Sequence, residues 1–168
     1  LLISGRGFSV QWKKKVNGSM TSLIYKNKEM LAHSDDFPVQ PVTQVFRAPT
    51  DNDKSFGNWL AKDWSLHQMD NPRISLDFFK HEVREDGAVI VRIQTRNRYK
   101  EGMIVTKFLY TILSDGTIDL KTTFQPQGIL PELPRLGIAF CLSSDYNTFI
   151  WQGRGCLLYT SPSPRDTR

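Results

Sequence analysis

The chain has 168 residues, of which 39% are hydrophobic and 11% aromatic, enough for one folded domain with a real core. Its net charge of +5 comes from scattered cations, with one tight run at residues 13–15 and alternating cations along residues 92–100, so no nucleic-acid partner is predicted. Its two cysteines are too few for a disulfide framework. No apolar run approaches the roughly 18 residues of a membrane span, and residues 1–5 are too short for a secretory signal, so we expect a cytoplasmic protein without a membrane partner.

Alternating hydrophobic residues predict short strands at residues 8–12, 20–25 and 29–31, with turns at residues 16–19 and 26–28. Four further strands are separated by turns that contain glycine. Their core-facing residues are expected to be Ile74, Leu76 and Phe78; Val89, Val91 and Ile93; Ile104, Phe108, Tyr110 and Ile112; and Ile118, Leu120, Thr122 and Phe124. The pattern is typical of an all-β, antiparallel β-sandwich in which each sheet has one buried face.

Two segments depart from the strand pattern. Residues 56–66 are predicted to form one short helix or helical loop, because aromatic and aliphatic residues recur near helical spacing after a possible N-cap region at residues 53–55. The proline-containing segment 125–134 is predicted to break the sheet and to form a crossing connection, since a strand pattern resumes at Leu136.

The most distinctive motif is the heptad that runs from Arg47 to Asp53, RAPTDND. Pro49 restricts the backbone on both sides, and the side chains of Asp51, Asn52 and Asp53 are of the kind that hydrogen-bonds to nearby backbone. The motif predicts a rigid polar turn with a cation at its entrance.

As a string, FRAPTDND resembles the signature that opens the C-terminal small-chain β-sandwich domain of bacterial β-galactosidases of glycoside hydrolase family two. The segment FSVQWKKKVNGSMTSLIYKNKEML resembles the hairpins that precede this signature, and LPRLGIAFCLS and FIWQGRG follow in the expected order. The resemblance covers residues 3–155 and implies the N-terminal part of a galactose-mutarotase-like supersandwich.

The resemblance also implies a function. The parent enzyme would be an oligomer that hydrolyses terminal β-D-galactosides such as lactose with retention of configuration. Its catalytic glutamates would lie in an upstream TIM-barrel domain or large subunit, so this chain alone is expected to be inactive, to frame the active site and to support the barrel.

The close carboxylates Asp51 and Asp53 are the one pair of catalytic interest, because a retaining glycosidase needs two carboxyl groups about 5 to 5.5 Å apart. In a turn opened by proline, such side chains more often accept backbone hydrogen bonds or pair with a cation such as Arg47. The signature turn, which comprises Arg47, Asp51, Asn52 and Asp53, is therefore predicted to be structural, and no catalytic residue is assigned.

In the family, the segment after the signature borders the galactose pocket. Ser55, Phe56, Gly57 and Asn58 occupy that stretch here and are candidate pocket residues. Gly57 can absorb large backbone changes, and an exposed Phe56 could stack on a sugar. Alternatively, Phe56 and Trp59 anchor the loop to the core, and both interpretations stay open.

No metal site is predicted in this chain. Asp51, Asp53 and Ser55 match the spacing of the first ligands of a calcium loop, but Phe56 stands where that loop requires glycine and Lys62 where it requires an acid. The three histidines lack the pattern of a zinc site. The family's magnesium and sodium ions are expected in other domains of the parent enzyme.

Residues 1–155 are expected to form one truncated small-chain domain. The Ser/Pro/Arg-rich residues 156–168 lose the strand pattern and depart from the family, so they are predicted to be a non-native or disordered tail. Together with the initial Leu1, this tail suggests a shortened reading of a longer protein.

Two other classes of protein stay open. A free-standing carbohydrate-binding sandwich would need an exposed aromatic platform, although two of its four candidates, Trp12 and Trp151, are expected to be mostly buried. The other two candidates are Trp59 and Trp64. A subunit-assembly module would instead associate with a barrel-containing partner without binding or cleaving sugar.

Overall fold

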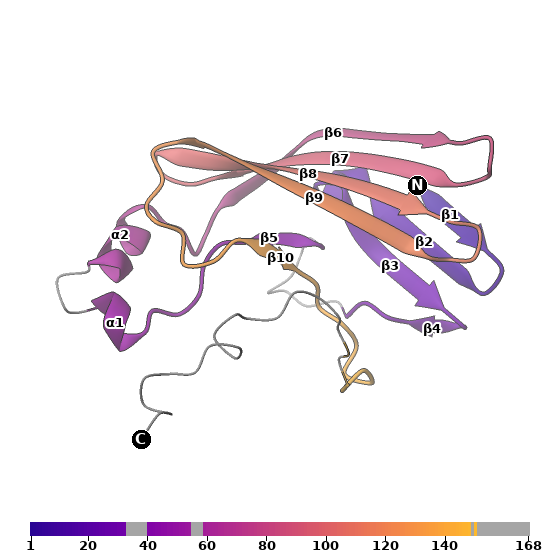
Figure 1. Cartoon of the computed structure of the whole chain (residues 1–168), viewed down its shortest axis with the longest axis horizontal. Coiled ribbons are helices and arrows are strands. Elements are labelled where there is room, and N and C mark those ends of the chain that lie inside the picture. Colours follow the sequence, from indigo (N-terminus) through magenta and orange to yellow (C-terminus); the bar gives the residue numbers. More distant parts are fainter. Residues whose placement is uncertain (33–39, 55–58, 149, 151–168) are drawn as a thin grey trace, which may run out of the picture.

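The computed structural model of the chain describes residues 1–32, 40–54, 59–148 and 150, and these residues form three antiparallel sheets (Figure 1). The first sheet contains β1 (Leu2–Gly5), β2 (Phe8–Lys13), β3 (Ser19–Tyr25) and β4 (Lys28–Glu29), in that order. The second contains β6 (Arg73–Val83), β7 (Val89–Arg98), β8 (Gly102–Ile112) and β9 (Ile118–Gly128). The third pairs β5 (Val42–Gln44) with β10 (Gly137–Ala139). The helical segments are the 3-10 turn η1 (Lys14–Val16), α1 (Asp51–Lys54) and α2 (Leu60–Leu66).

The two four-stranded sheets stack as two layers, as Figure 1 shows. Their facing side chains form the main core, which joins β2 and β3 of one sheet to β6, β7 and β8 of the other. The innermost members include Val10, Trp12, Val91 and Tyr110. The edge of Trp12 meets the ring of Tyr110 at a centroid distance of 5.4 Å. The predicted all-β antiparallel sandwich is therefore confirmed.

A second core lies at the end of the β6–β9 sheet where the two short α-helices sit. Its buried members are Val45, Trp64, Met69, Tyr99 and Ile104. This core packs α2 against the ends of β7 and β8, and it places the RAPTDND heptad beside them.

The structure corrects the predicted burial on β6. The strand pairing shifts by one residue between Leu76 and Phe78, so no β7 residue lies directly opposite Asp77 in the register and the alternation of faces changes there. Phe79 consequently enters the core with 8% of its surface exposed, whereas Phe78 is 37% exposed. The expectation that Phe78 shares the buried face of Leu76 is wrong.

The predicted helix and the predicted sheet break are also corrected. The described helix α2 begins at Leu60, its N-cap is Trp59, and Asp53 lies within the separate helix α1 rather than in an N-cap region for α2. β9 continues through Pro126, which pairs with Ile104, as far as Gly128. Pro126 is tolerated because β9 is an edge strand of its sheet, where alternate N–H groups point to solvent instead of to a neighbouring strand.

Gly128 allows the chain to turn closely past the β7–β8 hairpin, and Gly128→Ala should lower the free energy of unfolding by about 1 to 3 kcal/mol. Gly128 has a φ of +76°, and a Cβ there would lie 2.8 Å from the carbonyl oxygen of Glu101. Urea unfolding measures the change. As the control, Gly137→Ala on β10 meets no heavy atom within 4 Å and should be neutral or slightly stabilising. Equal effects of the two substitutions would contradict this account.

Candidate functional site

The heptad folds into a turn that is held together by the carboxylate of Asp53. Arg47 donates to both carboxylate oxygens, from Nη1 to Oδ2 at 2.6 Å and from Nη2 to Oδ1 at 3.1 Å. The backbone N–H and the hydroxyl of Thr50 also donate to Oδ2, at 2.6 and 2.7 Å. Only 6% of the surface of Asp53 is exposed. The carboxylate therefore has four hydrogen-bond donors and little contact with water.

This environment favours the ionised form of Asp53. The hydrogen bonds from Arg47, followed by those from Thr50, hold the pKa of the Asp53 carboxyl well below its usual range. The same pairing raises the pKa of Arg47. A carboxyl group of this kind does not carry a proton near neutral pH, so Asp53 is unsuited to act as a general acid.

Thr50 is a residue whose role the prediction missed. It directly precedes α1, and Asp53 is the third residue of that helix, so the two have the T-x-x-D spacing of a capping box. The Asp53 side chain accepts the Thr50 N–H, and the Asp53 N–H donates to the Thr50 carbonyl at 3.1 Å. The T-x-x-D spacing was the signal from which this contact could have been predicted.

Arg47 also connects the turn to α2. Its guanidinium carbon lies 5.3 Å from the centre of the Trp64 ring, a distance that permits a cation–π contact. The rings of Phe46 and Trp64 also meet edge to face, with their centroids 6.4 Å apart. The indole N–H of Trp64 donates to the carbonyl oxygen of Glu132 at 2.8 Å. One buried side chain thus joins the signature turn, α2 and the segment that follows β9.

The other predicted site residues are placed as follows. Asp51 and Asn52 are exposed on α1. The candidate pocket residues Ser55, Phe56, Gly57 and Asn58 lie outside the described residues, between α1 and α2 in sequence, and so do Trp151 and the tail of residues 156–168.

Within the described part of the chain, no group of three or more His, Cys, Asp or Glu side chains is arranged to hold a metal ion. The helices of this part include none that is long and apolar enough to cross a membrane. The cytoplasmic location stays a prediction.

The fold and the motif define the chain as an antiparallel β-sandwich domain that carries a salt-bridged RAPTDND turn at one end. The chain belongs to the β-galactosidase small chain family, whose family model matches residues 4–156. The predicted resemblance is thereby confirmed.

Three curated relatives illustrate the match. The β-galactosidase of Halalkalibacterium halodurans is 29% identical over 157 residues, which cover 91% of this chain and 14% of that protein. The β-galactosidase of Kluyveromyces lactis is 31% identical over 145 residues, 84% of this chain and 14% of that protein. The β-galactosidase small subunit of Latilactobacillus sakei is 28% identical over 152 residues, 81% of this chain and 46% of that protein. The chain therefore spans less than half the length of each of these relatives.

Proposed function

We propose that this chain serves as the small-chain domain of a β-galactosidase that hydrolyses terminal β-D-galactosides such as lactose with retention. The observation that carries the proposal is the family match over residues 4–156, together with relatives whose names are all β-galactosidase. In this proposal the domain frames the active site and braces the catalytic barrel, and it supplies neither the acid nor the nucleophile.

The geometry of the heptad supports this non-catalytic role. Both oxygens of the Asp53 carboxylate accept hydrogen bonds from Arg47, and one also accepts two from Thr50. A nucleophilic carboxylate needs an oxygen that can approach the sugar, and a general acid needs a raised pKa. Asp53 has the opposite environment, so its contribution is to fix the turn.

The turn holds the two helices on either side of the pocket-bordering segment. Asp53 lies in α1 and Trp64 in α2, and Arg47 contacts both side chains. These contacts hold α1 and α2, the two helices that flank residues 55–58 in sequence. We infer that the pocket-bordering role of Ser55 to Asn58 depends on this support, and that role stays a prediction from the family resemblance.

The partner is proposed to be an upstream TIM-barrel domain or a large subunit within an oligomer. Support comes from the relatives: the chain matches 14% of two single-chain β-galactosidases and 46% of a protein named a small subunit. Magnesium and sodium, if the parent enzyme uses them, are proposed to bind outside this chain.

The carbohydrate-binding alternative receives little support from the described tryptophans. Trp12 and Trp64 are each only 1% exposed, and both belong to the cores. Trp59 is 65% exposed, but a single side chain does not form an aromatic platform.

A replacement experiment tests the proposed function. We expect deletion of the matching segment from the Halalkalibacterium halodurans β-galactosidase to abolish hydrolysis of o-nitrophenyl β-D-galactoside, and insertion of residues 4–156 of this chain to restore it at least in part. The 168-residue chain assayed alone should show no hydrolysis. Activity of the chain alone, or a chimera that unfolds as cooperatively as the intact enzyme but is as inactive as the deletion, would contradict the proposal.

A further inference from the structure

The outer face of the β6–β9 sheet, which points away from the β1–β4 sheet, carries a row of arginines on β7. Two of them are matched by carboxylates of the neighbouring strand β6. Arg92 Nη1 lies 2.8 Å from Glu82 Oε1, and Arg96 Nε lies 2.9 Å from Asp77 Oδ2. Asp77 also accepts a hydrogen bond from Gln94 at 2.7 Å. Arg92 and Arg96 are therefore each neutralised by a carboxylate on the neighbouring strand.

Arg98 breaks this pattern, because the residue directly opposite it on β6 is Arg73. Directly opposite residues of an antiparallel pair project from the same face with their Cβ atoms about 4.5 to 5.5 Å apart, and like charges there are destabilising. Both arginines are exposed, and neither forms an ion pair with any carboxylate of the described residues. Two unmatched guanidinium groups are thus held on one side of the sheet.

The two arginines open onto a hollow of about 430 Å³ between the end of α2 and the β7–β8 turn. The rest of its wall consists of Gln68, Asn71, Tyr99 and Lys100. The lining therefore contains three cations and two amides but no carboxylate. Gln68 holds a left-handed backbone with a φ of +55°, a conformation uncommon outside glycine and asparagine. The backbone N–H of Lys100 donates to the carbonyl of His67 at 3.2 Å and fixes the turn against α2.

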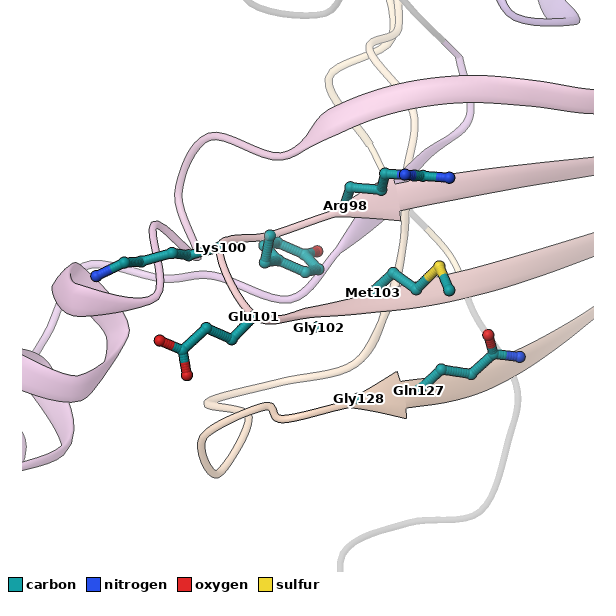
Figure 2. Close-up of a pocket in the computed structure, with 8 residues that line it drawn as sticks. Arg98, Lys100, Glu101, Gly102, Met103, Gln127 and Gly128 are labelled. Atoms are coloured by element: carbon teal, nitrogen blue, oxygen red, sulfur yellow. The ribbon is translucent and has the colours of Figure 1, made fainter.

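The acidic side chain of this turn, Glu101, lines an adjoining hollow that shares Arg98, Tyr99 and Lys100 with the first (Figure 2). Figure 2 shows Glu101 extending outward from the turn, whereas Arg98 lies along its strand and extends the opposite way. The Glu101 carboxylate lies 3.7 Å from His67 Nε2. Glu101 therefore does not take the place of a counter-ion between Arg73 and Arg98.

We propose that the hollow formed by Gln68, Asn71, Arg73, Arg98, Tyr99 and Lys100 binds an oxyanion, a carboxylate or a phosphate group, between Arg73 and Arg98. Guanidinium groups bind such oxygens in pairs of parallel hydrogen bonds, and amide NH₂ groups add further donors. The volume of the hollow is that of a small-molecule site. An anion here would supply the negative charge that Glu82 and Asp77 supply to the other arginines. The inference does not rest on the proposed hydrolase role.

Thermal unfolding of the 168-residue chain in inorganic phosphate, compared with sodium chloride of equal ionic strength, tests the proposal. Binding to the folded state adds RT ln(1 + c/Kd) to the stability, where c is the phosphate concentration, so Tm keeps rising with the logarithm of c above Kd, whereas screening alone gives equal curves in the two salts. We expect Arg98→Gln and Arg73→Gln each to raise the apparent Kd for phosphate, obtained from the Tm response, at least about tenfold. Arg84→Gln, which removes an exposed arginine paired with Asp86, is the matched control and should keep the wild-type response.

A second readout separates anion binding from a purely structural role. In chloride alone, Arg98→Gln should leave Tm unchanged or raise it, because it relieves repulsion from Arg73. Arg92→Gln loses its contact with Glu82 and should lower Tm slightly. Identical Tm curves in phosphate and chloride, or a wild-type phosphate response in both Arg98→Gln and Arg73→Gln, would overturn the proposal.

Acetate in place of phosphate distinguishes the source of the anion. A response to acetate as well as phosphate indicates a general oxyanion site that an acidic side chain of the remaining protein can fill. A response to phosphate alone indicates a free phosphoryl ligand, and a response to acetate alone a carboxylate. A chain that responds to neither ion has no oxyanion site in this hollow.

Discussion

Trp64→Ala is expected to lower the free energy of unfolding by about 3 to 5 kcal/mol, the range for truncating a large aromatic residue in a core. The indole is 1% exposed, packs against Phe46 and lies under the guanidinium of Arg47. It also donates its N–H to the carbonyl of Glu132, which would be left without that donor. Urea unfolding followed by circular dichroism measures the loss.

Trp59→Ala is the matched control, because it removes the same side chain only five positions away in sequence. Trp59 is 65% exposed, so its removal should change stability by no more than about 0.5 kcal/mol. Trp64→Phe keeps an aromatic ring but removes the indole N–H, and it should cost less than Trp64→Ala, about 1 to 3 kcal/mol. If Trp59→Ala and Trp64→Ala proved equally destabilising, the second core would not be organised around Trp64.

The second large effect is expected for Asp53→Asn, which removes the charge that Arg47 and Thr50 bind while nearly keeping the shape of the side chain. The pKa of Asp53 is lowered on folding, so the unfolded chain binds the proton more readily. The stabilisation is therefore complete above the ordinary Asp pKa and is lost as pH falls below about 4. The difference in stability between the wild type and Asp53→Asn should be largest near neutral pH and shrink in acid.

Other carboxylates also contribute to acid sensitivity, because hydrogen bonding lowers the pKa of Glu29 and of Asp115. The comparison of wild type with Asp53→Asn removes these shared contributions, and Asp119→Asn, an exposed residue of β9, controls for loss of a charge. A double-mutant cycle with Arg47→Gln should show strong coupling at pH 7. A wild-type minus Asp53→Asn difference that is the same at pH 3 and pH 7 would contradict the assignment of the ion pair.

Much of the architecture follows from local pattern. Strand alternation has a period of two residues, so the buried set Ile104, Phe108, Tyr110 and Ile112 can be read from neighbouring positions alone. The turn chemistry of RAPTDND is likewise local, since Pro49 restricts the backbone and Asp53 pairs with a residue only six positions away. The same string was enough to suggest the family.

Tertiary structure decided the features that depend on partners distant in sequence. The register shift at Asp77 buries Phe79 instead of Phe78. It arises from the pairing of β6 with β7, so it cannot be predicted from the alternation along β6 alone. The choice of Trp64 over Trp59 as the buried anchor depends on the carbonyl of Glu132, which lies 68 positions from Trp64 in sequence.

The sequence by itself determined an antiparallel sandwich, the approximate positions of β2 to β4 and β6 to β9 but not of β1 or β5, and a polar signature turn with Arg47 at its entrance. Only the tertiary structure decided that Arg73 faces Arg98, that Pro126 remains within β9, and that α1 and α2 are separate helices joined through Trp64 and Arg47. The physical reason is that periodicity and turn chemistry act over a few residues. Register, burial and charge pairing are set by whichever distant segment completes the hydrogen bonds and the packing.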